Sequence, residues 1–184
     1  VKMYVDVLHN RADNYQDRLE ILARTGSDPA DLGNYMRESG TPSFGTGSIT
    51  GAKNGVEIGG MWAAAEFDDV TVTNPTNAGL EITGSSASTV NDLTVSGGNY
   101  GVLIGAGASG NVELTNIDIA GTNTAGVYYV KDLAGSLTGN IGTSLGAGIK
   151  FGSATSKDLS WDQMSLSGNA VGIAIAAGLH SGMR

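Results

Sequence analysis

Two short apolar patterns recur along most of the chain at intervals close to 23 residues. The first is a glycine followed by an alternating triplet whose outer residues are apolar. Its six copies begin at Val56, Leu80, Val102, Val127, Ile149 and Ile173, which lie 24, 22, 25, 22 and 24 residues apart. Alternation with a period of two is typical of a β-strand with one buried face. Each triplet is therefore predicted to be a short strand.

The second pattern reads apolar, two polar, apolar, one polar, apolar, as in Phe67-x-x-Val70-x-Val72. It returns from Val90, from Leu114 and from Trp161. A further copy is expected from Leu137, but there Ile141 falls one position late, which predicts a β-bulge or an extra turn residue. Each repeat thus holds at least two strand-forming segments.

A period near 23 residues with short strands and no helix has few structural solutions. Leucine-rich repeats need a fixed Asn or Cys and a regular leucine ladder, which are absent here, and propeller blades need about 40 residues or more. A parallel β-solenoid remains, in which each repeat is one coil with alternate side chains in a stacked core. We predict an all-β fold with about five to six coils of 22–25 residues over residues 54–184.

Coil length and strand pattern over roughly residues 54–178 resemble the right-handed parallel β-helix family, the pectate-lyase-like superfamily. This resemblance implies a right-handed solenoid with a polar ladder that links successive coils. Much of the superfamily cleaves polysaccharides. The chain resembles a surface or adhesin-type solenoid more than a catalytic member, because the resemblance includes no catalytic signature.

Residues 1–53 have a different texture and hold 13 of the 28 charged side chains. Alternation over residues 1–7 predicts a strand. Helical spacing with capping residues predicts one helix within residues 10–26 and a second over residues 28–40. Residues 41–53 are rich in Ser, Thr and Gly and are predicted to be a linker. We expect this small helical region to be a cap on the solenoid or an insertion.

The composition excludes several classes of function. The 29 glycines among 184 residues suit a chain that turns often and disfavour a helical bundle. A net charge of −8, with ten Lys and Arg spread thinly, gives no electrostatic footprint for nucleic acid. No apolar run is long enough to insert in a membrane. The absence of Cys removes disulfides and thiolate chemistry.

Residues one period apart become neighbours about 4.8 Å from each other when coils stack in register. One such column runs through Asp69, Asp92, Asn116, Gly139 and Gln163. It lies between two strands, where a residue with positive φ is needed to turn a corner, and Asp, Asn and Gly tolerate that backbone best. Asp69, Asp92, Asn116 and Gln163 are therefore predicted to be a structural turn ladder.

The acidic residues near this column are also candidates for binding. They are Glu66, Asp68, Asp69, Asp92 and Asp118. Carboxylates in adjacent coils repel each other, and Ca²⁺ held by oxygen ligands would relieve that repulsion, although no EF-hand or nonapeptide repeat is present. Carbohydrate is the other candidate ligand. No other cofactor is expected, and a role in turns is the simpler explanation for each residue.

A catalytic site has little support in the sequence. A polysaccharide lyase needs a Lys or Arg base, and the basic residues after residue 53 are Lys131, Lys150, Lys157 and Arg184. Asp68, Asp69, Asp92 and Asp118 could in principle form the carboxylate cluster of a glycosidase.

A solenoid exposes unpaired strands at its two ends unless a cap covers them. The N-terminal helices are expected to cover one end, whereas no cap is predicted after Ile175. We therefore expect end-to-end stacking with neighbouring subunits or flanking domains. The expected function is a non-catalytic structural or interaction module at an extracellular, cell or virion surface, of adhesin, surface-layer, fibre or tail-spike type. The alternatives are a polysaccharide lyase or glycoside hydrolase and a self-assembling filament subunit.

Overall fold

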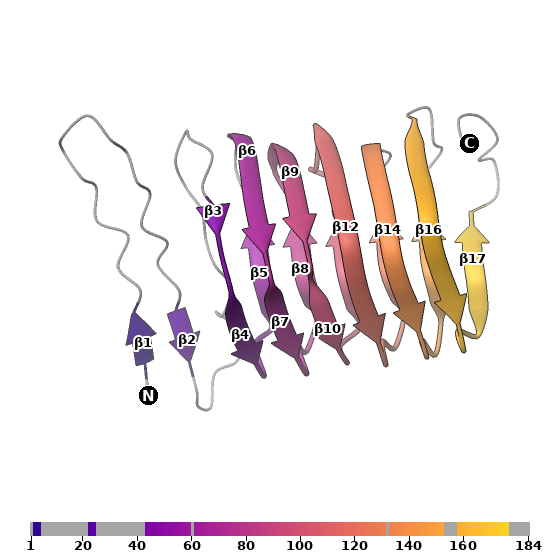
Figure 1. Ribbon diagram of the computed structural model, residues 1–184, viewed down its shortest axis with the longest axis horizontal. Helices are drawn as coiled ribbons and strands as arrows, with labels where there is room; N and C mark the ends of the chain where they lie inside the picture. Colours follow the sequence, from indigo (N-terminus) through magenta and orange to yellow (C-terminus); the bar gives the residue numbers. More distant parts are fainter. Residues whose placement is uncertain are drawn as a thin grey trace.

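The computed structural model describes residues 2–4, 22–24, 43–59, 61–131, 133–152 and 158–176. From residue 43 onward these residues form a parallel β-solenoid of about five turns, whose coils lie side by side along one axis (Figure 1). No helix occurs in the described part of the chain, so none there could cross a bilayer. The predicted all-β solenoid is confirmed.

One wall of the solenoid is a sheet of six strands, one from each predicted triplet. These are β5 (Asn54–Ile58), β8 (Ala78–Ile82), β11 (Tyr100–Ile104), β13 (Ala125–Tyr129), β15 (Ala147–Phe151) and β17 (Val171–Ile175). Every neighbouring pair is parallel and in register. Residues at equal positions in successive triplets are therefore direct neighbours, as Glu57 and Glu81 are.

The opposite wall is a sheet of nine strands. These are β3 (Ser43–Phe44), β4 (Gly47–Thr50), β6 (Met61–Asp68), β7 (Val70–Thr73), β9 (Ser85–Asn91), β10 (Thr94–Ser96), β12 (Asn111–Ala120), β14 (Ala134–Gly142) and β16 (Leu159–Ser167). The long strand β12 pairs in parallel with both β9 and β10. Strands β9 and β10 are thus the two arms of one coil segment, separated by a corner.

The first coil begins before the predicted boundary at residue 54. Residues 43–50, which were assigned to a linker, form β3 and β4 and pair in parallel with β6 and β7. The Ser, Thr and Gly content predicted a linker, and strand β4 contains a single apolar residue, Ile49. That side chain packs against the core, one coil away from Val72.

The predicted N-terminal helices are only partly within the described residues. Leu22–Arg24, expected near the end of the first helix, form strand β2 instead, antiparallel to β1 (Lys2–Tyr4). Pairing with β1 satisfies backbone groups across the two strands and overrides a weak helical periodicity. Within the strand predicted over residues 1–7, Lys2–Tyr4 form β1, and its other residues lie outside the described part of the chain. The second predicted helix also lies outside the described residues.

Apolar columns from the two walls meet in a continuous core. Val56, Leu80 and Val102 are each at most 1% exposed and lie one coil apart on the first wall. Val72 and Val95, equally buried, are neighbours on the opposite wall. An inner residue such as Leu80 is therefore covered by the coils before and after it as well as by the facing wall.

Each coil turns two corners with left-handed backbone. The predicted ladder forms the first corner, with φ of 52° at Asp69, 52° at Asp92, 54° at Asn116 and 50° at Gln163. The second corner was not predicted. Its residues, all with positive φ, are Gly51, Asn74, Gly97, Gly121, Thr143 and Gly168.

The coil that contains Leu137 is irregular, but in the opposite sense to the prediction. Leu137 pairs with Leu114, whereas Ile141 pairs with Ile119, so β14 has one residue fewer than β12 between these two pairs. The missing apolar position is taken by Gly139, which has a φ of 125°. The coil is therefore shortened by one residue and has no extra turn residue.

The glycine before each of the first five triplets is required by close stacking of the coils. A methyl group added at Gly126 would lie 2.1 Å from Cγ2 of Ile141 and 2.7 Å from the carbonyl oxygen of Gly148 in the next coil. The equivalent glycines Gly55 and Gly79 meet the next coil's carbonyl oxygen in the same way. Only hydrogen fits between the two coils at this position.

Substitution in this glycine column tests the packing. Gly126→Ala is expected to lower the free energy of unfolding by about 1–3 kcal/mol, because the added methyl group overpacks the contact between coils. Gly172→Ala is the matched control, since no described residue lies within 4 Å of the added methyl group, and it is expected to change stability by less than about 0.5 kcal/mol. Urea denaturation of both variants measures the difference, and equal stability would contradict this account of the column.

The core also contains a buried hydroxyl that has no partner among the described residues. Tyr129 is 2% exposed and stacks on Phe151 at 5.2 Å, and its hydroxyl makes no hydrogen bond to any described residue. Tyr129→Phe removes an unsatisfied buried group and is expected to raise the free energy of unfolding by about 1 kcal/mol. Tyr128→Phe, at the half-buried neighbouring position, serves as the control, and a loss of stability in Tyr129→Phe would show that the hydroxyl is bonded.

Candidate functional site

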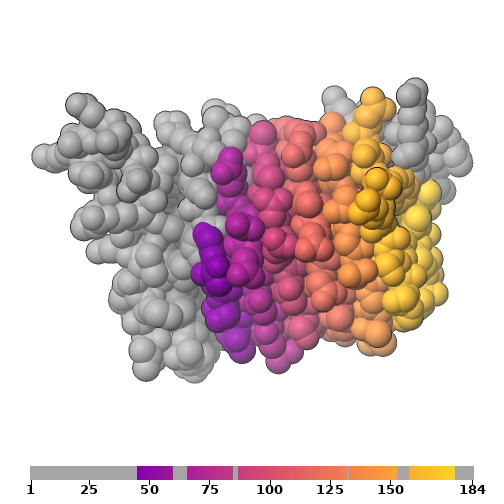
Figure 2. Space-filling view, viewed as in Figure 1, coloured from indigo at the N-terminus to yellow at the C-terminus, as the bar shows by residue number. Residues whose placement is uncertain are grey.

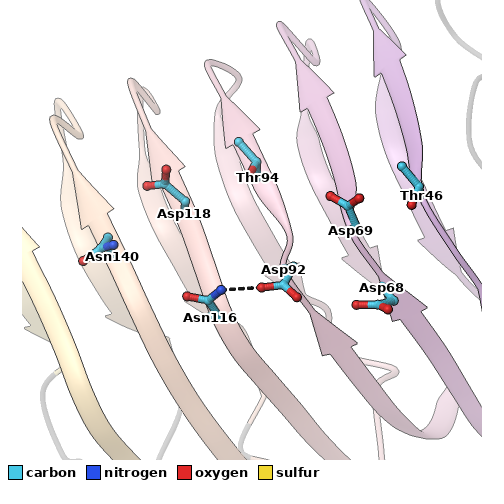
Figure 3. Close-up of a pocket in the computed structure, with 8 residues that line it drawn as sticks. All are labelled: Thr46, Asp68, Asp69, Asp92, Thr94, Asn116, Asp118 and Asn140. Carbon is cyan, nitrogen blue, oxygen red and sulfur yellow. Dashed lines mark hydrogen bonds between the residues drawn. The ribbon is translucent and has the colours of Figure 1, made fainter.

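A shallow polar groove runs along the nine-stranded wall, across successive coils (Figure 3). Its volume is about 570 Å³. The residues that line it are Thr46, Asp68, Asp69, Asp92, Thr94, Asn116, Asp118 and Asn140. In the space-filling view, the coils of this wall lie against one another as successive bands of colour (Figure 2). The groove is thus a feature of several coils and belongs to no single loop.

One row of groove residues is placed by the first corner. Asp69, Asp92 and Asn116 occupy equivalent corner positions in three successive coils. The Asn116 side-chain amide donates a hydrogen bond to a carboxylate oxygen of Asp92 (Figure 3). The Asn116 backbone amide donates in turn to Oγ1 of Thr138 at 2.9 Å. These bonds link three coils, so the corner residues stabilise the stack.

The second row is placed by strand register. Thr94 pairs with Asp118, and Asp118 pairs with Asn140, in adjacent strands of the same wall. These side chains are partly or fully exposed and occupy the outward positions of their strands. The groove therefore presents hydroxyl, amide and carboxylate groups in two rows whose repeat along the axis is one coil.

Four of the five predicted acidic candidates line this groove. Asp68, Asp69, Asp92 and Asp118 do so, whereas Glu66 lies on β6 outside the lining. Gln163, the last member of the predicted ladder, shares the corner backbone but also lies outside the lining. The lining includes no Lys, Arg or His.

These four carboxylates do not form a preformed metal site. No group of three or more Asp, Glu, His or Cys side chains suited to a metal ion occurs within the described residues. One carboxylate oxygen of Asp92 already accepts the Asn116 bond. Ca²⁺ binding here stays a prediction.

The groove is also a poor setting for glycoside hydrolysis. A general acid is usually desolvated so that it keeps its proton near neutral pH. Asp68, Asp69, Asp92 and Asp118 are all exposed. The arrangement is suited to hydrogen bonding with a polyhydroxylated or cationic ligand.

A second polar cluster lies on the six-stranded wall. The Asn54 side chain is 4% exposed, and its amide donates to Oε2 of Glu57 at 3.2 Å and to Oε2 of Glu81. Its carbonyl oxygen accepts a bond of 2.9 Å from the Asn77 amide. Burial and the neighbouring Glu57 carboxylate raise the pKa of Glu81, although the Asn54 bond and the charge of Lys53 oppose this shift.

Sequence periodicity contained the signal for this cluster. Asn54 and Asn77 are one period apart, as Glu57 and Glu81 are, so stacking brings two amides and two carboxylates together. Alternation alone marks Glu57 and Glu81 as the outward residues of their strands. The buried position of Asn54, one residue before the strand glycine, was missed.

Comparisons with known proteins give no relative for this chain: no protein-family model matches it, and neither the curated proteins nor the solved structures searched include a match. The parallel β-solenoid is therefore established by the structure, without support for a particular superfamily. The features of the molecule that bear on its function are the groove, the polar cluster and the ends of the solenoid.

Glu81 gives the solenoid a pH dependence that can be measured. With its pKa raised above 4.5 in the folded state, Glu81 binds a proton more tightly when folded than when unfolded. Stability from this group therefore falls as pH rises from about 4.5 through the raised value. Glu81→Gln is expected to be more stable than the wild type at neutral pH, with a smaller difference near pH 4.

Thermal or urea unfolding across this pH range measures the effect, with Glu113→Gln as the control at an exposed carboxylate on the opposite wall. A Glu81→Gln variant that loses stability at neutral pH and keeps it in acid would show that the ionised form is the favoured one.

Proposed function

We propose that this chain is a non-catalytic structural and interaction module of an extracellular surface protein, of adhesin, surface-layer, fibre or tail-spike type. The observation that carries the proposal is the in-register stacking of the coils around one continuous core. Such a scaffold holds a fixed spacing and repeats surface groups at regular intervals. A location at a cell or virion surface follows from that role.

We also infer that the chain belongs to the right-handed parallel β-helix, pectate-lyase-like superfamily. Coil length and the polar corner ladder support this assignment. The Asn116–Asp92 bond is one rung of that ladder.

In the proposed module, the polar groove is the surface that contacts carbohydrate. Its hydroxyl, amide and carboxylate groups match the hydrogen-bonding capacity of sugar hydroxyls. An acidic lining without Lys or Arg disfavours uronates and other anionic glycans and favours neutral or amino sugars. Bound Ca²⁺ would extend recognition to uronates. Uronate binding that requires Ca²⁺ would therefore distinguish a Ca²⁺ site from direct binding of neutral or amino sugars.

A polysaccharide lyase or glycoside hydrolase is the second candidate, and it is favoured by one observation. Asp69, Asp92 and Asp118 reach the same groove from successive coils. Against it stands the exposure of all three side chains. A self-assembling filament subunit is the third candidate, and it depends on the ends of the solenoid.

Incubation with a panel of neutral, amino-sugar and uronate polysaccharides, with and without Ca²⁺, tests the module against the enzyme. We expect binding without release of reducing ends or unsaturated products. Asp92→Asn with Asp118→Asn is expected to weaken binding at least about tenfold, a loss of about 1.4 kcal/mol. Asp162→Asn, an exposed residue beside the corner of β16 but outside the groove, is the matched control. Cleavage that disappears in the groove variant and persists in Asp162→Asn would show that the protein is an enzyme and would contradict the non-catalytic module.

A further inference from the structure

Two tyrosine side chains lie against each other on the outer surface of the six-stranded wall. Tyr100 of β11 and Tyr128 of β13 come from neighbouring coils, and their ring centroids are 5.6 Å apart with an angle of 28° between the ring planes. This distance is typical of stacked aromatic pairs. Both side chains are partly exposed, so small molecules in solution have access to the pair.

The position of Tyr128 is also restricted from its other side. Strand β13 lies between β11 and β15 in the sheet, so Tyr100 and Lys150 approach Tyr128 from opposite neighbours. The Lys150 ammonium lies 4.8 Å from the centre of the Tyr128 ring, where a cation is attracted to the ring face. The Tyr128 hydroxyl lies beside Gly152, at which an added methyl group would be 2.7 Å from it. These contacts hold the Tyr128 ring against Tyr100.

Tyr129, the next residue along β13, has different surroundings. It is buried in the core and stacks on Phe151. Among the described side chains, Tyr100 and Tyr128 are the two phenol rings that stack on each other. The chain contains no Cys, so no disulfide links its coils and no thiol competes for an oxidant. The stacked pair therefore combines accessible phenols with direct contact between two coils.

We propose that Tyr100 and Tyr128 form an oxidative cross-linking site, at which a one-electron oxidant of the haem-peroxidase class joins the two rings as dityrosine. The new bond connects β11 to β13 and links two successive coils covalently. Stacking holds the reacting rings together before oxidation, so the coupling takes place within one molecule and needs no collision between two molecules.

The reaction removes two hydrogen atoms in total. Each phenol loses one electron to the oxidant and one proton to solvent, and becomes a tyrosyl radical. The two radicals couple through ring carbons ortho to their oxygens, which forms one carbon–carbon bond. Each coupled carbon then loses its proton and each ring oxygen gains one, so both rings become aromatic phenols again. The two electrons and two protons released reduce one hydrogen peroxide molecule to two water molecules.

Oxidation of the purified chain with a haem peroxidase and limiting hydrogen peroxide tests the site. We expect dityrosine fluorescence from a product that stays monomeric. Proteolysis after glutamate separates Tyr100 from Tyr128 by cleavage at Glu113, and no glutamate follows in the sequence. Mass spectrometry is expected to find the peptides of residues 82–113 and 114–184 still joined, with a mass lower than their sum by two hydrogen atoms.

Two variants remove one phenol each and keep both rings. Tyr100→Phe and Tyr128→Phe are each expected to lose the link between the two peptides, because phenylalanine forms no phenoxyl radical. Tyr129→Phe is the matched control, since it removes a neighbouring phenol that stacks on Phe151, and it is expected to form the link like the wild type. The yield of linked product per molecule is expected to stay constant as the protein is diluted.

Several results would overturn the proposal. They are the absence of the link in the oxidised wild type, a link that maps to other tyrosines, and a link that persists in Tyr100→Phe. A yield that rises with protein concentration would also overturn it, because the coupling would then come from collisions between molecules. None of these results bears on carbohydrate binding, since the groove lies on the opposite wall.

Discussion

Close contact between successive coils is the constraint on which the whole solenoid depends. Two coils can approach each other closely only where no side chain lies between them. Gly126 is such a position, because a methyl group added there would lie only 2.7 Å from the carbonyl oxygen of Gly148 in the next coil. That approach brings parallel strands into register. Register then aligns apolar side chains such as Val102 and Val127 into the columns that form the core. Core, corners and groove all follow from one repeated backbone contact.

Much of this architecture could be predicted from the sequence because stacking converts a period in the chain into a neighbour in space. The six triplets and the acidic corner residues were found in this way. Strand β4 was missed because it contains a single apolar residue, Ile49, and alternation cannot be recognised from one position. The second corner was missed because Gly51, Asn74 and Thr143 share a backbone conformation and no side-chain chemistry.

The residues of the candidate site could be predicted from the sequence, but the shape of the groove could not. Periodicity placed Asp69, Asp92 and Asn116 in one column, but the groove also needs the strand row that includes Thr94 and Asp118. The distance between these two rows depends on the angle of the corner, and that angle could not be predicted from the sequence. The Asn54 network was missed for a related reason, since its burial depends on residues one coil away.

The outward column of the six-stranded wall changes in charge along the solenoid axis. The outward column begins with Glu57 and Glu81 and later holds Lys150, whose ammonium lies 4.8 Å from the centre of the Tyr128 ring. At Ala174, on the edge strand itself, the column is neutral. The pairing of β15 with β17 therefore depends on backbone hydrogen bonds and apolar burial, which salt screens far less than it screens ion pairs. By contrast, a cationic ligand in the acidic groove would be held through charge. Added salt would therefore weaken binding of such a ligand more than it weakens the stack of coils.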